Sequence, residues 1–121
     1  MRRFAMAAAL LLTMMVPALA QYPGEWVLGQ YQGGRYWFPG IVAASGNGKV
    51  TIRYDDGTRE TLSPERVRLY DWKAGSRIEC RWKNGGDWYA GRIVFLDKAT
   101  LHIKYDDGDF EKTSTGRCRS N

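Results

Sequence analysis

The sequence has a single histidine, His102, and only two cysteines. A lone histidine cannot form a Ser–His–acid or Cys–His set by itself, so we expect neither an enzyme nor a bound cofactor. Acidic and basic residues are interleaved, without a long tail of one sign, so the charge does not demand a polyanionic partner. The acids near Asp107 lack the loop and distal glutamate of known calcium sites, and no metal is expected.

Long apolar runs are also missing, except for residues 4–16 at the N-terminus. This run follows Arg2 and Arg3 and precedes Pro17 and an Ala-Leu-Ala step, which is the order of a secretory signal peptide. It is shorter than the about 20 residues of a membrane span. We expect cleavage after Ala20, which leaves an exported chain, periplasmic or extracellular, with no membrane span. The alternative is an uncleaved anchor. Cleavage lowers the formal charge from +5 to +3, because it removes two arginines and none of the 13 acids.

The rest of the chain is an internal repeat. Residues 24–68, the first copy, align without a gap on residues 75–119, the second copy, at an offset of 51 positions. Identical residues include both Tyr-Asp-Asp-Gly stretches, 54–57 and 105–108, and many other pairs are similar. We therefore predict a signal peptide over 1–20, one domain over 21–69 and a second over 75–121.

Each copy has the pattern of short strands. Apolar residues alternate with polar ones over 50–55 and again over 101–106, which indicates strands with one buried face. Asn47-Gly48 and the two Asp-Gly pairs are hairpin turn signals. No stretch after residue 20 has ten residues of helical periodicity. Five short strands in about 45 residues predict a small barrel or a strongly bent sheet.

The motifs of both copies resemble those of Tudor domains. In the second copy they are the Gly-x-x-Ile-x-Cys-x-Trp opening, the step "WYAG" and the hairpin "YDDG"; the first copy has "WFPG" and "YDDG". Plant Agenet domains share much of this pattern. The resemblance covers essentially the whole chain after residue 20. It implies an all-β protein of two tandem five-stranded SH3-like, Tudor-type barrels.

Many Tudor domains bind methylated lysine or arginine in an aromatic cage, and the resemblance implies such a site in each copy. Its residues are Trp82, Tyr89, Tyr105 and Asp107 in the second copy, and Tyr31, Phe38, Tyr54 and Asp56 in the first. Aromatic faces attract a cation, and a carboxylate adds Coulomb attraction. We expect a better cage in the second copy, because it has a tryptophan. The alternative is that the tyrosines only cap the core and Asp-Gly only turns the hairpin.

In a Tudor-type barrel the strands that carry Cys80 and Cys118 are neighbours, so the resemblance implies a disulfide between them. The alternative is two buried free thiols. Tyr70 and Trp72 in the linker are candidates for the contact between the copies. Trp37 and Trp88 either join that contact or form a separate exposed patch.

The sequence thus favours an exported, non-enzymatic module that binds a cationic group, a methylated side chain or a peptide. A second hypothesis is binding of nucleic acid or an envelope polyanion through a basic face. Its residues are Arg66, Arg68, Arg117 and Arg119, which flank the last strands, together with Arg53 and Lys104. A third is a purely structural or interaction protein that uses its tryptophans and a strand edge.

Overall fold

The computed structural model describes residues 21–83 and 85–121, which fold into two five-stranded antiparallel sheets. The predicted signal peptide lies outside the described residues. The first copy contains β1 (Trp26–Gln30), β2 (Trp37–Gly46), β3 (Lys49–Tyr54), β4 (Arg59–Leu62) and β5 (Val67–Leu69). The second contains β6 (Arg77–Arg81), β7 (Trp88–Asp97), β8 (Thr100–Tyr105), β9 (Phe110–Ser114) and β10 (Cys118–Arg119). Single 3-10 turns occur at Tyr31–Gly33, Pro64–Arg66 and Thr115–Arg117.

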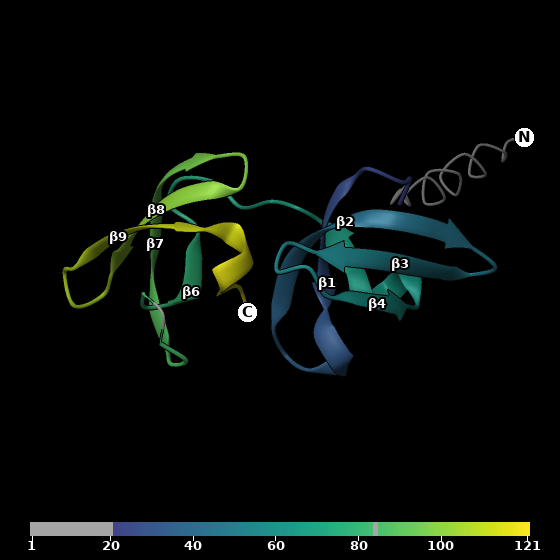
Figure 1. Cartoon of the computed structure of the whole chain (residues 1–121), viewed down its shortest axis with the longest axis horizontal. Coiled ribbons are helices and arrows are strands. Elements are labelled where there is room, and N and C mark those ends of the chain that lie inside the picture. Colours follow the sequence, from purple (N-terminus) through teal and green to yellow (C-terminus); the bar gives the residue numbers. More distant parts are fainter. Residues whose placement is uncertain (1–20, 84) are drawn as a thin grey trace, which may run out of the picture.

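The two sheets have the same topology. The strand order is β4-β3-β2-β1-β5 in the first copy and β9-β8-β7-β6-β10 in the second, so the last strand of each copy returns to pair with the first. The prediction of an all-β protein with two tandem five-stranded units is therefore confirmed. Figure 1 shows the copies as two lobes side by side, with the linker running between them and the C-terminus at their junction. Among the described residues, no helix has the length and apolar character to cross a membrane.

The predicted alternation and turns are present in both copies. Val50, Ile52 and Tyr54 of β3 are buried, as are the matching residues of β8. Asn47 and Gly48 both have positive φ, 54° and 76°, which is the backbone of a tight primed hairpin turn.

Cys80 and Cys118 form a disulfide, as predicted. They are direct partners in the β6–β10 pairing, and both are completely buried. The bond closes a loop that contains nearly all of the second copy. This fixes the short β10, which has only two residues and few ladder hydrogen bonds of its own.

The contact between the copies extends the core of the second copy. Leu28, on β1, follows Val27, which is buried in the core of the first copy, so the Leu28 side chain lies on the opposite face of the strand. It is fully buried in one cluster with Trp72 and Ile78. A sheet face that points away from its own core is covered here by the second copy. Trp72 joins this contact, as predicted, and its Nε1 donates a hydrogen bond to Ser120 Oγ at 3.2 Å.

The C-terminus also ties the copies together through the backbone. Trp37 N donates to Ser120 O at 2.8 Å, and Ser120 N donates to Trp37 O at 2.9 Å. Trp88 packs edge-on against Phe38 of the first copy, with ring centroids 6.2 Å apart. Both tryptophans whose position the sequence left open therefore lie at the contact between the copies.

Candidate functional site

A cavity of about 390 Å³ opens at one end of the second copy. We call it the second-copy opening. Its lining residues are Trp82, Tyr89, Ala90, Tyr105, Asp106, Asp107 and Asp109. All four residues predicted for the second cage are among them. The tertiary structure thus brings together three rings and an acid that the sequence spreads over 26 positions.

Strand pairing places the three rings. Tyr89 at the start of β7 pairs with Cys80, two residues before Trp82, and Gly91 pairs with Tyr105 at the end of β8. The Tyr105 ring contacts both other rings edge-on, at centroid distances of 5.6 Å to Trp82 and 6.4 Å to Tyr89. Among the described residues no such contact joins Trp82 to Tyr89, so the space between these two rings is open. Tyr89 is 48 % exposed and available to a ligand.

The glycine of the aromatic–small–Gly step is required by close backbone contact. A Cβ atom at Gly91 would lie 2.5 Å from Lys104 O and 2.9 Å from Tyr105 Cα. Gly40 has the same restriction, with Arg53 O at 2.6 Å. Only glycine lets the two strands approach at this point, and this approach sets the position of the tyrosine.

A glutamate that sequence reasoning did not assign to the site fixes its geometry. Tyr105 donates its hydroxyl hydrogen to Glu111 Oε1 at 2.5 Å, and Lys83 N donates to Glu111 Oε2 at 2.8 Å. Glu111 therefore joins the tyrosine to the loop that carries Trp82. Burial, and then the Glu111 carboxylate, raise the pKa of Tyr105 well above its usual value, so the hydroxyl stays a donor.

The first copy repeats this arrangement. Tyr54 donates to Glu60 Oε1 at 2.7 Å, and Gln32 N donates to Glu60 Oε2 at 2.8 Å. The signal was present in the sequence, because a glutamate follows each YDDG tyrosine at a fixed distance of six residues. The role of this glutamate could not be assigned from the sequence, because it depends on tertiary structure. The strand that carries the glutamate, β4 or β9, lies beside the loop that follows the first strand of the same copy.

The second-copy opening is acidic. Asp106 forms a two-contact ion pair with Arg77, at 2.8 and 2.9 Å, which holds the pKa of this carboxyl below its usual range. Asp107 Oδ1 accepts the Asp109 N–H at 2.9 Å, which shapes the turn. In the part of the chain that the structure describes, neither Asp107 nor Asp109 forms an ion pair. Two uncompensated carboxylates therefore face a site walled by rings.

A cation of the chain itself lies near one wall. Lys83 Nζ is 5.0 Å from the Trp82 ring centroid, within the range of a cation–π contact. Over the described residues, no group of three or more His, Cys, Asp or Glu side chains is arranged to hold a metal ion.

The first-copy residues come together differently. Tyr31, Phe38 and Tyr54 contact one another in all three pairs, with ring centroids 5.8 to 6.3 Å apart. In the second copy, by contrast, no ring contact among the described residues joins Trp82 to Tyr89. Asp56 Oδ1 accepts hydrogen bonds from Thr58 N and Thr58 Oγ1, at 2.9 and 2.7 Å, and so belongs to the turn.

The second copy covers one side of this cluster. Thr115 donates its hydroxyl hydrogen to Asp55 Oδ2 at 2.5 Å. A Cβ atom at Gly116 would lie only 3.0 Å from the Asp55 carbonyl atoms, so the two backbones are in close contact. Asp106, the matching residue in the second copy, lines the second-copy opening and pairs with Arg77 of its own copy. The two copies are alike in sequence and strand order but not in access.

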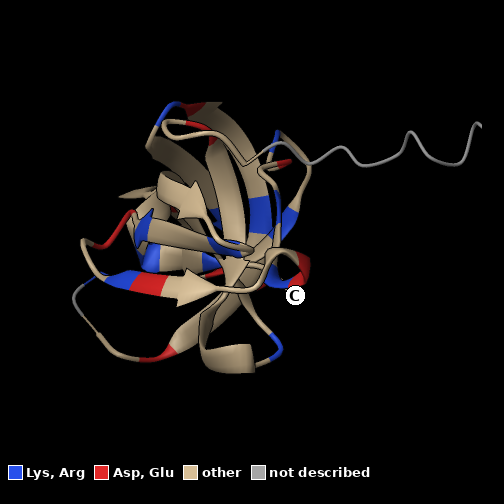
Figure 2. Ribbon diagram, turned by 90° about the vertical axis from the view of Figure 1, so that its right-hand side faces the viewer, with Lys and Arg blue, Asp and Glu red and all other residues tan. Residues whose placement is uncertain are grey.

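The arginines next to the last strands make cation–π contacts, hydrogen bonds and an ion pair within the protein. Arg68 lies over the Trp37 ring at 4.2 Å. Arg119 lies between the rings of Tyr36 and Trp88, at 3.5 and 4.0 Å, and binds Glu79 at 2.8 Å. In the first copy, Arg66 Nη2 donates a hydrogen bond to Gln30 O. In the second copy, Arg117 Nη2 donates one to Arg81 O. Figure 2 shows basic and acidic residues interspersed along the ribbon.

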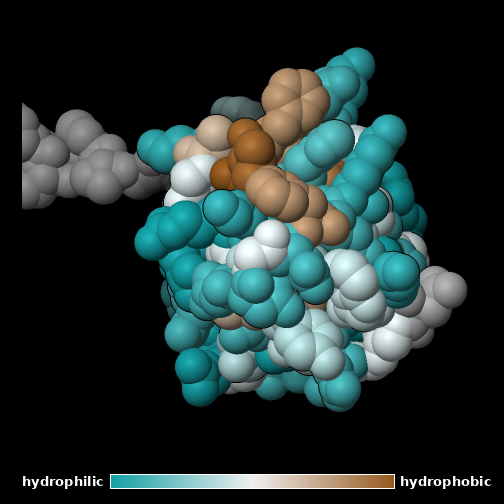
Figure 3. Space-filling view, turned by 90° about the vertical axis from the view of Figure 1, so that its left-hand side faces the viewer, coloured by the Kyte–Doolittle hydropathy of each residue, from teal (hydrophilic) through white to brown (hydrophobic). Residues whose placement is uncertain are grey.

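A small apolar patch that the sequence did not reveal lies on the outer face of the second copy. Its members are Val94, Phe95 and Phe110, which are 49, 56 and 62 % exposed. A bulge between Ile93 and Phe95 turns two consecutive side chains outward. Figure 3 shows apolar side chains gathered on this face. The first copy has Ala43, Ala44 and Arg59 at the matching positions.

No family model and no curated protein matches the chain. Solved structures that match include the AGD34 unit of AGDP1 from Arabidopsis thaliana, at 17 % identity and a TM-score of 0.40, over 84 % of this chain and 82 % of that one. The tandem Agenet domain 3-4 of ADCP1 matches at 17 % identity and a TM-score of 0.38, over 84 % of this chain and 80 % of that one. At this identity and these TM-scores, neither structure assigns a family or a function to this chain.

Proposed function

We propose that this protein is a non-enzymatic binding module whose second copy holds a cationic side chain, such as a methylated lysine or arginine of a protein or peptide. One observation carries the proposal: Trp82, Tyr89 and Tyr105 line a single cavity of about 390 Å³ together with Asp107 and other acids. The first copy serves mainly as a support, because its three rings pack against one another.

The chemistry of the second-copy opening favours a methylated cation. Methyl groups spread the positive charge over an apolar surface that has no N–H donors. Aromatic faces bind such a surface better than a carboxylate alone does. Each well-placed ring contributes about 0.5–2 kcal/mol to binding of the cation. The carboxylates of Asp107 and Asp109 add long-range attraction and accept any N–H that remains.

The test is a titration with a peptide that carries trimethyl-lysine, followed by NMR or calorimetry. We expect saturable binding that shifts the Trp82 indole signal. A neutral isostere, with a tert-butyl carbon in place of the trimethylammonium nitrogen, is expected to bind at least about tenfold more weakly, because it has the shape but not the charge. Equal binding of the two peptides would show that charge is not recognised and would refute the cage.

The repeat supplies a matched pair of variants for the same titration. Asp107→Asn and Asp56→Asn remove one charge at equivalent positions, where each aspartate accepts the same turn N–H at 2.9 Å. We expect Asp107→Asn to weaken binding of the trimethyl-lysine peptide about three- to tenfold and Asp56→Asn to leave it unchanged. If both variants weaken binding equally, the effect comes from the turn or from net charge.

We also propose that the chain acts outside the cytoplasm, in the periplasm or the extracellular medium. The order of charge, apolar run and small residues over 1–20 supports this, as does the Cys80–Cys118 disulfide, because such bonds persist in oxidising compartments. Expression with the complete N-terminus, followed by fractionation and mass measurement, tests it. A mature chain that begins at Gln21 in the exported fraction is the expected result, and a full-length chain retained in the cytoplasm would contradict it.

A further inference from the structure

A second cavity, of about 120 Å³, lies between the two copies. We call it the seam pocket. Its lining residues are Trp26, Pro39, Gly40, Ile41, Asp55, Tyr70, Lys98 and Ala99. They come from β1, β2 and the turn after β3 in the first copy, from the linker, and from the β7–β8 turn of the second copy. The pocket therefore exists only when the two copies are docked.

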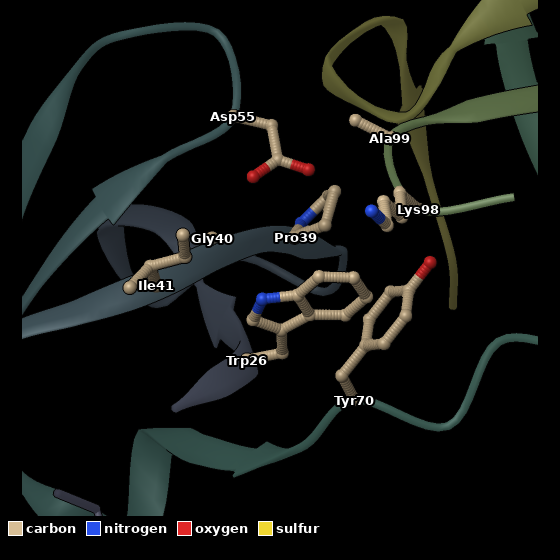
Figure 4. Close-up of a pocket in the computed structure, with 8 residues that line it drawn as sticks. All are labelled: Trp26, Pro39, Gly40, Ile41, Asp55, Tyr70, Lys98 and Ala99. Atoms are coloured by element: carbon tan, nitrogen blue, oxygen red, sulfur yellow. The ribbon is translucent and has the colours of Figure 1, made fainter. Parts of the chain in front are cut away.

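The walls of the seam pocket are mainly apolar. The rings of Trp26 and Tyr70 contact each other edge-on, with centroids 5.6 Å apart, and Pro39 and Ile41 complete the apolar surface. Figure 4 shows these two rings side by side, with Lys98 and Asp55 reaching toward the pocket from two different turns. The seam pocket, at about 120 Å³, is smaller than the dry apolar cavity of about 150 Å³ that encloses benzene, but it is partly open to solvent, so a ring can enter it with one edge outside.

A hydroxyl group at this pocket has no partner. Tyr70 Oη is buried and makes no hydrogen bond within the described residues. Burial, and then the carboxylates of Asp55 and Asp71, raise the pKa of Tyr70 to about 12, so the group is a donor at neutral pH. A buried donor without an acceptor is costly to the fold. The hydroxyl group is thus placed to bind an acceptor that enters the pocket.

The other polar groups restrict the ligand further. Asp55 Oδ2 accepts the hydrogen bond of the Thr115 hydroxyl, and Asp55 Oδ1 has no hydrogen bond among the described residues. This carboxylate disfavours an anionic ligand and can accept an N–H. Lys98 forms no ion pair in the described chain and disfavours a cationic ligand. A neutral group with both an acceptor and a donor fits these surroundings best.

We propose that the seam pocket is a second binding site, which takes an apolar group of about the size of a benzene ring attached to an amide. The amide oxygen accepts the Tyr70 hydroxyl hydrogen, the amide N–H donates to Asp55, and the apolar group packs on the Trp26 ring. A peptide segment with an aromatic or branched aliphatic side chain presents this combination. This site is separate from the second-copy opening and uses none of its residues.

Benzamide and toluene are suitable probes, because they share the ring and only benzamide has the amide. We expect benzamide to shift the Trp26 indole and Ala99 amide signals in NMR titrations of the purified protein, and to bind more tightly than toluene. Tyr70→Phe should weaken benzamide about fivefold or more and leave toluene unchanged, because it removes only the hydroxyl. The same affinity of benzamide for the wild type and Tyr70→Phe would overturn the proposal.

Two further variants make the outcome decisive. Ala99→Trp places a large side chain at the rim of the seam pocket, on an exposed turn that tolerates change, and should abolish the benzamide shifts. Asp107→Asn, in the second-copy opening, should leave them unaltered even where it weakens the trimethyl-lysine peptide. If benzamide causes no shifts at Trp26 in the wild type, the pocket holds only water and the proposal is wrong, whatever the second-copy opening binds.

Discussion

The glutamate behind the second-copy opening gives the sharpest test of how the fold supports the site. Glu111 accepts the Tyr105 hydroxyl hydrogen at 2.5 Å and the Lys83 N–H at 2.8 Å. A hydrogen bond to a charged group contributes about 1.5–3 kcal/mol, and the low end suits a carboxylate that is only partly buried. Glu111→Ala is therefore expected to lower the free energy of unfolding by about 3 kcal/mol. Glu111→Gln keeps one carbonyl acceptor and should lose about half as much.

The same change should also affect binding. Without Glu111, nothing among the described contacts joins Tyr105 to the loop that carries Trp82. We expect the affinity for the trimethyl-lysine peptide to fall about tenfold, as for the loss of one well-placed ring. Glu111→Gln loses about half as much stability, so its affinity for the peptide should lie between those of the wild type and Glu111→Ala.

The measurements are urea unfolding for stability and a peptide titration for affinity, with near-UV circular dichroism to verify the fold. Glu60→Ala is the matched control, because Glu60 makes the same two hydrogen bonds in the first copy. It should lower stability by a similar amount and leave peptide affinity unchanged. The reasoning is refuted if the free energy of unfolding of Glu111→Ala lies within about 0.5 kcal/mol of the wild-type value. It is also refuted if Glu60→Ala lowers the affinity for the peptide as strongly as Glu111→Ala does.

Three other predictions concern the fold. Burial first, and then hydrogen bonding to a glutamate, raise the pKa of Tyr54 and of Tyr105. The stability that these hydroxyl groups contribute is complete below about pH 10, which is the pKa of tyrosine in the unfolded chain, and it should be lost as the pH rises above this value. The absorbance of tyrosinate at 295 nm should therefore rise together with unfolding. Ionisation of both tyrosines near pH 10 in the folded protein would contradict this prediction. Reduction of the Cys80–Cys118 bond should destabilise the second copy by about 4 kcal/mol, seen as a lower calorimetric Tm, and an unchanged Tm would show that packing alone holds β10. Gly116→Leu should separate the copies, because a Cβ atom there meets the first-copy backbone at 3.0 Å. A larger radius of gyration in X-ray scattering is expected. An unchanged radius would show that the contact adjusts locally and the copies stay together.

Local features of the chain were predictable from the sequence. The repeat, the alternation over 50–55 and the Asn-Gly turn specify strands and hairpins because side-chain direction in a strand changes with every residue. Strand register then follows from which face is buried. The rings of the second-copy opening were named through the resemblance to Tudor domains, because the matching motif positions lie on or next to these strands.

The tertiary structure decided what differs between the copies. Both carry the same motifs, yet only one copy can dock its C-terminal turn against the other, and this docking brings Gly116 against Asp55 in the first copy. Leu28 is buried for the same reason, because its strand face meets the second copy and not water. The sequence determined two similar units with a ring-and-acid motif in each; the asymmetric packing between them decided which motif is open and created the seam pocket, because contacts between distant segments are not encoded in a local pattern.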